Sequence, residues 1–294
     1  MKVFCVILSY NNEKILQVIR SVLSQSLAPS KIIVVDNNSE SFYKKKLFQM
    51  KNKKVEVIFN KNNVGVGMGY NIGIKKSLAN KADAIWLLDG DAIPEKDCLN
   101  NLIEAFYQKG CYIFSPISID PITNIPTIGT LHPLGLRKTK LIVQKSKIIE
   151  IDSCLTAGCF IPAQIFKKAG MYREDFFVDF IDHEFALRVR KHGFKIFLVP
   201  KAKIYHSIGE FEKKIKKRLH KLWRTYFMIR NSTYVTFHLH PSIFPIWAYY
   251  YFISFFLARL KRYHSFKFVK IFVQGLNDGI KGKLMNNLWW LNYE

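Results

Sequence analysis

Residues 84–91 read AIWLLDGD, an apolar run of strand length that ends in two aspartates on either side of a glycine. Three earlier runs are also strand-like: Val3–Ser9 (VFCVILS), Lys31–Asp36 (KIIVVD) and Val55–Phe59 (VEVIF). Apolar residues recur at helical spacing between them, from Ile15 to Leu23 and from about Met68 to Leu78. This alternation of strands and helices predicts an α/β fold with a Rossmann-like, mainly parallel sheet and flanking helices.

Polar residues follow the predicted strands at the point where each strand ends. Ligands of parallel sheets bind beyond the carboxyl ends of the strands, so we expect the functional site at this edge. The residues collected there are Ser9, Tyr10, Asp36, Asn37, Asn38, residues 60–63, Asp89 and Asp91. The predicted site is therefore polar and acidic, although the protein is basic.

The Asp89-Gly90-Asp91 sequence is the strongest single motif. Its glycine permits a sharp turn that can direct both carboxylates outward. Two carboxylates this close repel each other unless a cation lies between them, and hard divalent cations prefer oxygen ligands. The motif favours a metal or nucleotide site. The alternative is an acidic turn that caps a helix beginning near Pro94-Glu95.

A glycine-rich segment, NVGVGMGYNIG, covers residues 63–73. Its G-x-G-x-G-x-x-x-G spacing follows the third strand and matches neither the dinucleotide fingerprint nor the P-loop. A glycine-rich turn at the start of a helix can bring backbone N–H groups close to a phosphate or sugar. A tight turn without a ligand is an equally good interpretation.

A second acidic cluster, FFVDFIDHEF at residues 176–185, leads into a helical pattern. The helix macrodipole keeps carboxylates near a helix N-terminus ionised, as a general base requires. The alternative is ordinary capping, with Asp182 as the N-cap. His206 follows another predicted strand, Lys195–Pro200, within the sequence IYHSIG. A lone histidine there is more often structural, unless it has a partner such as Asp91.

The composition excludes several classes of protein. The 294 residues carry a net charge of +23 with 49% hydrophobic residues, so the chain is not disordered. Five cysteines without a CxxC pair argue against a disulfide framework and a Cys-rich zinc site, and fit a reducing cytosol. The first residues lack the features of a signal peptide, so we expect the catalytic part in the cytoplasm.

More than half of the net charge, +13, lies within residues 201–294. Residues 231–258 contain no Lys, Arg, Asp or Glu but many aromatic residues, and basic clusters flank them. This pattern favours a helix lying in an anionic membrane surface, peripheral on the inner face. A spanning helix and a buried core helix are the alternatives. Nucleic acid is not an expected partner, because basic and aromatic residues occupy separate blocks.

Taken in order, the motifs VILSYNN, IIVVDNNS, NxGxGxGxN, LLDGD, FFVDFIDHEF and YHSIG resemble those of family 2 glycosyltransferases of the A-type fold. The last four resemble the rhamnosyltransferase and galactofuranosyltransferase branch. The resemblance covers about residues 3–235. We therefore expect a catalytic domain at residues 1–210, followed by a basic, aromatic helical region at 211–294 whose charge pattern predicts association with the membrane.

The resemblance also implies roles for individual residues. Asp182 would be the catalytic base, with Asp179 as the second choice. Asp91 and His206 would bind Mn²⁺ or Mg²⁺. The nucleotide-sugar donor would contact Ser9, Tyr10, Asp36, Asn38, Gly67, Asn71, Asp89 and Gly158. Asp36 would bind the base of the nucleoside and Asp89 would lie near the ribose and diphosphate. Arg230-Asn231 also resembles a recurrent pair, without an assigned role.

The implied reaction is an inverting transfer of one rhamnose-like sugar from a nucleotide-diphosphate donor to a lipid-linked or cell-surface glycan. Such reactions build bacterial capsule, O-antigen or wall polysaccharide. A galactofuranosyltransferase or hexosaminyltransferase of the same fold is the alternative. From other classes, a basic nucleic-acid-binding protein or a non-catalytic membrane-docking protein would leave the acidic motifs unexplained. The apolar C-terminal region could also pair chains in a homo-oligomer.

Overall fold

The computed structural model describes residues 1–50, 52–127, 147–207, 209–212, 217–219, 221–250, 256, 257, 260 and 266–284. The longer strands are β1 (Val3–Ser9), β2 (Lys31–Asp36), β3 (Val55–Phe59), β4 (Ala84–Asp89), β6 (Ile113–Ile119) and β10 (Ile196–Tyr205). Shorter ones are β5 (Ile93–Pro94), β7 (Pro126–Thr127), β8 (Ile149–Ile151), β9 (Phe160–Pro162), β11 (Glu210–Glu212) and β12 (Lys217–Leu219). The helices before residue 200 are α1 (Ile15–Leu23), α2 (Ser41–Phe48), α3 (Gly65–Ala79), α4 (Cys98–Lys109), α5 (Ala163–Ala169) and α6 (Ile181–Lys191).

A large mixed sheet, mainly parallel among its long strands, confirms the predicted fold class. Its order is β3-β2-β1-β4-β9-β6-β10-β5, with β7 beside β6 and β8 beside β10. The strands β3, β2, β1 and β4 are parallel, as are β6 and β10, whereas β9 runs antiparallel between β4 and β6. Ser9 pairs with Asp36 and Leu8 with Asp89, so the polar ends of these strands meet at one edge.

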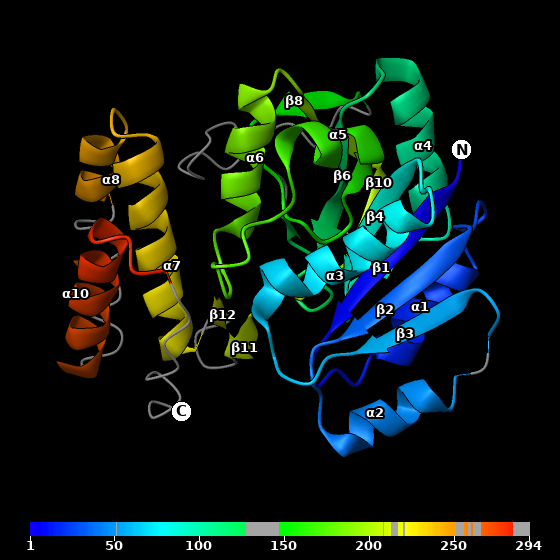
Figure 1. Ribbon diagram of the computed structural model, residues 1–294, viewed down its shortest axis with the longest axis horizontal. Helices are drawn as coiled ribbons and strands as arrows, with labels where there is room; N and C mark the ends of the chain where they lie inside the picture. The colour runs from blue at the N-terminus through cyan, green and yellow to red at the C-terminus, as the bar shows by residue number, and fades with distance from the viewer. Residues whose placement is uncertain are drawn as a thin grey trace.

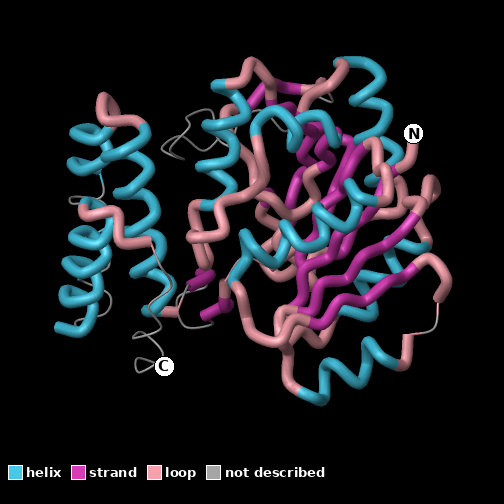
Figure 2. Tube along the Cα trace, viewed as in Figure 1, coloured by secondary structure: helices cyan, strands magenta, loops and turns pink. Residues whose placement is uncertain are grey.

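Helices cover both faces of the sheet (Figure 1; Figure 2). Successive strand residues point to opposite faces, so Val6 and Leu8 join one core while Cys5 and Ile7 join the other. The first core includes residues of α3, α5 and α6, and the second includes residues of α1 and α4. The sheet is therefore buried on both faces, and its carboxyl edge is free to carry a site.

Three element boundaries differ from the sequence-based expectations. Helix α3 begins at Gly65 and not near Met68, because Asn63 accepts a hydrogen bond from the Gly65 N–H. Helix α4 begins at Cys98, beyond the expected start at Pro94-Glu95, which instead forms part of β5 and the turn after it. Strand β10 continues past Pro200 to Tyr205, because the chain resumes pairing with β6 after an irregularity.

The C-terminal region contributes α7 (Leu222–Tyr234), a π-helical turn at Val235–Leu239, α8 (Phe244–Tyr250) and α10 (Phe266–Ile280). Helix α10 lies alongside α7 (Figure 1). A Cβ atom on Gly279 would stand 2.6 Å from the carbonyl oxygen of Arg230, so only glycine permits this close packing. The Tyr226 hydroxyl donates a hydrogen bond of 2.8 Å to Asp278, which fixes α10 along α7.

Only part of the aromatic segment predicted to contact a membrane is described. In α8, Trp247 is buried whereas Ile246 and Tyr249 are exposed, so this helix has one apolar side in the core and another on the surface. No helix within the described residues is both long and apolar enough to cross a membrane. Residues 251–255 and 258 of this segment, 213–216 of the basic run before it, and residue 259 after it lie outside the described residues.

Candidate active site

Asp89, Asp91 and His206 converge at the carboxyl end of β4. One ligand atom from each lies within 4.8 Å of the others. The Nε2 atom of His206 is 3.3 Å from Asp89 and 3.4 Å from Asp91. The topology explains the convergence, because β5 pairs with the end of β10 and so brings the chain after Asp91 beside His206. The structure thus joins two motifs that are more than a hundred residues apart.

The electrostatics of this group are those of a cation site. Burial alone would lower the pKa of His206, but Asp89 and Asp91 raise it to about 10. Burial likewise opposes ionisation of Asp89, whereas hydrogen bonding to His206 and to the hydroxyl of buried Tyr70 lowers its pKa overall. Two carboxylates and an imidazole suit Mn²⁺, and the carboxylates also suit Mg²⁺. The two carboxylates and the imidazole therefore fit a divalent cation, which would take the place of the proton on His206.

Asp36, at the end of β2, is fully buried. Its Oδ2 accepts a hydrogen bond from the Ser39 N–H, but its Oδ1 has no hydrogen-bond partner among the described residues. A buried acceptor without a partner costs free energy, so it indicates a position that a ligand donor can satisfy. Ser9 lies beside it in the sheet, and the Ser9 hydroxyl also faces the turn at Gly90.

The loops after β1 and β2 are fastened to each other, because the Asn11 N–H donates a hydrogen bond to the Ser39 hydroxyl and the Glu40 N–H donates one to the Asn11 side-chain carbonyl. Asn38 adopts a left-handed φ of 64°, and its side-chain oxygen Oδ1 accepts a hydrogen bond from Lys44 Nζ. Tyr10 is 52% exposed, so its ring is available to a ligand at the rim. Neighbouring Asn37 is structural, because its amide bonds to Asn63 and the Gly65 carbonyl. Ser9, Tyr10, Asp36 and Asn38 therefore surround one end of the carboxyl edge.

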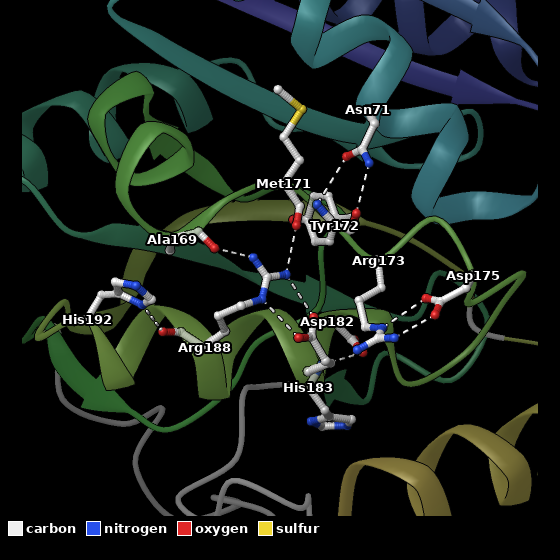
Figure 3. A network of polar contacts seen from close by, with 11 residues as sticks. Asn71, Ala169, Met171, Tyr172, Arg173, Asp175, Asp182, His183, Arg188 and His192 are labelled. Carbon is white, nitrogen blue, oxygen red and sulfur yellow. Dashed lines mark hydrogen bonds and ion pairs between the residues drawn. The ribbon is translucent and has the colours of Figure 1, made fainter. Parts of the chain in front are cut away.

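Helix α6 presents Asp182 in its first turn. The alternative interpretation of Asp182 as the N-cap is wrong, because Phe180, in a left-handed conformation, occupies that position. The Asp182 carboxylate accepts a hydrogen bond from the His183 N–H (Figure 3). Among the described residues it forms no ion pair. It also borders a small cavity with Thr156 and Tyr172. The Asp182 carboxylate is thus available to a substrate, because no cationic side chain of the described residues forms an ion pair with it.

Glu184, the other acidic residue of this helix turn, has a structural role. It is almost fully buried and forms an ion pair of 2.8 Å with Arg188. Arg188 in turn donates hydrogen bonds to the carbonyl oxygens of Ala169 and Met171 (Figure 3). The pair therefore fastens α6 to the end of α5 and holds the helix that carries Asp182.

Asp179, the second choice for the base, forms an ion pair with an arginine that the sequence motifs did not reveal. Arg224, on α7, donates two hydrogen bonds to its carboxylate, from Nε at 3.0 Å and from the terminal nitrogen at 2.5 Å. The negative charges of Asp179, Asp89 and Asp182 all raise the pKa of Arg224 against the effect of its burial. Arg224 was missed because it is one of ten basic residues between 201 and 230, and nothing in the sequence distinguishes it.

Three other predicted donor-binding residues have contacts that explain them structurally. A Cβ atom on Gly67 would stand 2.2 Å from the carbonyl oxygen of Arg173. Asn71 is buried, and its amide bonds to both the N–H and the C=O of Tyr172 (Figure 3). Gly158 adopts a φ of 90° against Pro116. Gly67 and Asn71 thus join α3 to the segment before α6, and their contact with a donor stays a prediction, as does that of Gly158.

Comparison with known proteins gives the family. Residues 4–169 match the family described as glycosyl transferase family 2. The chain is also 27% identical over 241 residues to the dTDP-rhamnosyl transferase RfbF of Shigella flexneri, a match that covers 78% of each protein. The family match confirms the family that the ordered motifs predicted.

Solved structures share the fold. GalNAc-T7 with UDP, GalNAc and Mn²⁺ superposes with a TM-score of 0.64 at 16% identity, over 80% of this chain and 47% of that one. TarS 1-349 of S. aureus in complex with UDP-GlcNAc superposes with a TM-score of 0.63 at 15% identity, over 96% and 81%. The chain thus spans about half of the first structure and most of the second. At these identities the likeness shows the fold alone.

We expect Asp91→Ala to weaken Mn²⁺ binding by more than about tenfold, because it removes one of two carboxylates from the cation group. Free Mn²⁺ measured by electron paramagnetic resonance, in titrations with a nucleoside diphosphate present, reports the affinity. Asp97→Ala removes an exposed carboxylate nearby and is the matched control. An Asp91→Ala titration that superposes on that of the unaltered protein would exclude Asp91 as a metal ligand.

Proposed function

Because this chain belongs to glycosyl transferase family 2, we propose that it transfers one rhamnose-like sugar from a nucleotide-diphosphate donor to a glycan acceptor, with inversion. The chain is a glycosyltransferase with the A-type fold. The observation that carries the proposal is the convergence of Asp89, Asp91 and His206. Asp182 belongs to the same site, because Asp89 and Asp182 both raise the pKa of Arg224. Such an acidic site offers nothing to a nucleic acid backbone, which argues against nucleic acid as a partner.

The free acceptor of Asp36 supports binding of the donor nucleoside. A thymine or uracil base carries an N3–H donor, which could satisfy the buried Oδ1 that has no partner among the described residues. Ser9 and Asn38 would line the same pocket, and Tyr10 would cover its rim. The diphosphate would then extend toward Asp89 and Asp91, because Leu8 and Asp89 pair in the sheet next to the Ser9–Asp36 pair.

The chemistry requires a base and a stabilised leaving group. Asp182 would accept the proton of the acceptor hydroxyl as that oxygen attacks the anomeric carbon. The bond from this carbon to the diphosphate breaks, and the nucleoside diphosphate leaves with the electron pair. A single displacement of this kind inverts the anomeric configuration. A Mn²⁺ or Mg²⁺ ion held by Asp91 and His206 would supply positive charge that stabilises the leaving diphosphate.

A screen of nucleotide sugars tests the donor. The match to RfbF supports dTDP-rhamnose. Hexosamine donors, as bound in the TarS and GalNAc-T7 structures, are one alternative. UDP-galactofuranose, suggested by the sequence motifs, is the other. We expect dTDP-rhamnose to raise the melting temperature with Mn²⁺ and to release dTDP faster than UDP sugars release UDP. Preferential turnover of a UDP sugar would reassign the donor but keep the transferase. No turnover of any nucleotide sugar would contradict the proposed reaction.

We expect Asp182→Asn to lower kcat for transfer by about 10²–10⁴-fold, the usual contribution of a general base. Donor binding, measured by calorimetry with Mn²⁺, should persist, because the substitution leaves the metal group and the Asp36 pocket intact. Asp97→Asn, at an exposed position, controls for a general loss of negative charge. Near-normal turnover by Asp182→Asn would rule this residue out as the base.

We propose that the acceptor is a lipid-linked glycan precursor and that the enzyme works at the cytoplasmic face of an anionic membrane. The net charge of +23 and its concentration beyond residue 200 support attraction to such a surface. The C-terminal helices also expose large apolar side chains, among them Ile246 (62%), Tyr249 (70%) and Phe266 (85%). Aromatic side chains next to basic ones are suited to the headgroup region.

Vesicle co-sedimentation tests this association. We expect binding to vesicles containing phosphatidylglycerol but weak binding to pure phosphatidylcholine, and a loss of binding at high salt because of screening. Tyr249→Ser combined with Phe266→Ser should reduce binding. Tyr107→Ser is the control, because Tyr107 is equally exposed at 69% but lies on α4. Equal binding to both vesicle types would contradict an electrostatic association, and equal binding by the double variant would exclude these two side chains.

A further inference from the structure

The turn that precedes α6 is strained. Asp179 and Phe180 adopt left-handed φ values of 62° and 64° in succession. For residues other than glycine this conformation is unfavourable, because Cβ comes too close to the following carbonyl oxygen. The strain persists only where surrounding contacts hold it. Since Ile181 already begins the helix, the conformation of these two residues sets the direction in which Asp182 leaves the turn.

Asn231, on α7, holds the backbone of this turn. It is fully buried, and its side-chain amide donates hydrogen bonds of 2.9 Å to the carbonyl oxygens of both Val178 and Asp179. Its own side-chain carbonyl accepts a hydrogen bond from Arg230 Nε, and Arg230 also reaches the carbonyl oxygen of Asp175. The two residues together therefore fix the chain over residues 175–179.

Arg224 holds the side chain of the same turn. It lies seven residues before Asn231, which is two helical turns, so both side chains project from the same face of α7. Its two hydrogen bonds to the Asp179 carboxylate form a bidentate pair, the geometry that a guanidinium favours and a lysine cannot reproduce. The Asp179 side chain is only 14% exposed, so water competes little with this pair.

Packing behind α7 makes it a rigid support. Gly275 and Gly279 let α10 approach the backbone of α7 at Tyr226 and Arg230, the stretch between Arg224 and Asn231. In front, Phe227 stacks on Phe177 with ring centroids 5.5 Å apart. A helix held on both sides can transmit its position to the turn, whereas a loosely attached helix could not.

We propose that Arg224 and Asn231 are positioning residues for the transfer reaction. By clamping the Asp179–Phe180 turn, they aim the Asp182 carboxylate at the acceptor hydroxyl, and α7 thereby belongs to the active site. This inference rests on the proposed role of Asp182 as the base. It predicts a defect in the chemical step and not in donor binding, because within the described residues neither residue forms a hydrogen bond or ion pair with Asp36, Asp89, Asp91 or His206; their bonds go to Val178, Asp179 and Arg230.

Kinetics of Arg224→Gln test the proposal. We expect kcat to fall by about 10–100-fold, the effect of misplacing a reacting group by roughly 1 Å. The donor KM and the Kd for the nucleoside diphosphate with Mn²⁺ should change less than about twofold on this mechanism. Arg224→Lys should recover only part of the loss, because an ammonium cannot form the bidentate pair. Adding Asp179→Asn to Arg224→Gln should cost little more, because the two residues act as one unit.

Arg190→Gln is the matched control, because it breaks another Arg–Asp pair, with Asp152, at the far end of α6. It should leave kcat within about twofold of the unaltered enzyme, and melting temperatures of all variants report folding. A normal kcat for Arg224→Gln would overturn the proposal. So would a tenfold weaker nucleoside diphosphate affinity at unchanged kcat, since Arg224 would then bind the donor directly.

Hydrogen exchange provides a readout that does not depend on turnover. We expect Arg224→Gln to accelerate amide exchange across residues 178–184 while the strands exchange as before. Unchanged exchange there would overturn the clamp even if the enzyme proves to use another base. Conversely, an inactive unaltered protein, or a fully active Asp182→Asn variant, would contradict the proposed reaction. The exchange rates of residues 178–184 would still test whether Arg224 holds the turn. The two failures are therefore distinguishable.

Discussion

Repulsion among carboxylates is the constraint on which this site depends. Asp89 and Asp91 stand within reach of the same imidazole, and the charges of Asp179 and Asp182 act on the same guanidinium as Asp89. Such a group is stable only if cations are placed among its members. His206 supplies one positive charge between Asp89 and Asp91, and Arg224 supplies another at Asp179. A bound divalent ion could take over the task of the imidazolium.

Those cations come from parts of the chain that follow β1 to β4 in sequence. His206 depends on β10, which pairs with both β6 and β5 and so ends beside the turn after β4. Arg224 depends on α7, which α10 fixes through its two glycines. The last third of the chain therefore contributes charge to the site as well as exposed apolar surface. This also gives part of the basic excess a task inside the protein, separate from the membrane attraction that we propose.

The parts that the sequence predicted are those governed by local rules. Apolar runs and their spacing located β1 to β4, and parallel pairing then placed Ser9, Asp36 and Asp89 at one edge. Arg224 could not be predicted, because only the packing of α7 distinguishes it from neighbouring lysines. The glycines were ambiguous for a related reason. A close approach between segments, as at Gly67 against Arg173, leaves the same mark in a sequence as a phosphate-binding loop.

The acidic residues of the site fall into two groups once their partners are known. Asp89 is held by Tyr70 and His206, Asp179 by Arg224 and Glu184 by Arg188, so these carboxylates maintain the geometry. Within the described residues, Oδ1 of Asp36 and the carboxylate of Asp182 lack such partners. Leaving the buried Oδ1 of Asp36 unsatisfied is costly, so it persists where a ligand will use it, whereas Asp182 keeps only the hydrogen bond from the adjacent His183 N–H. The proposed reaction accordingly assigns these two carboxylates to its two ends, Asp36 to the nucleoside and Asp182 to the attacking hydroxyl.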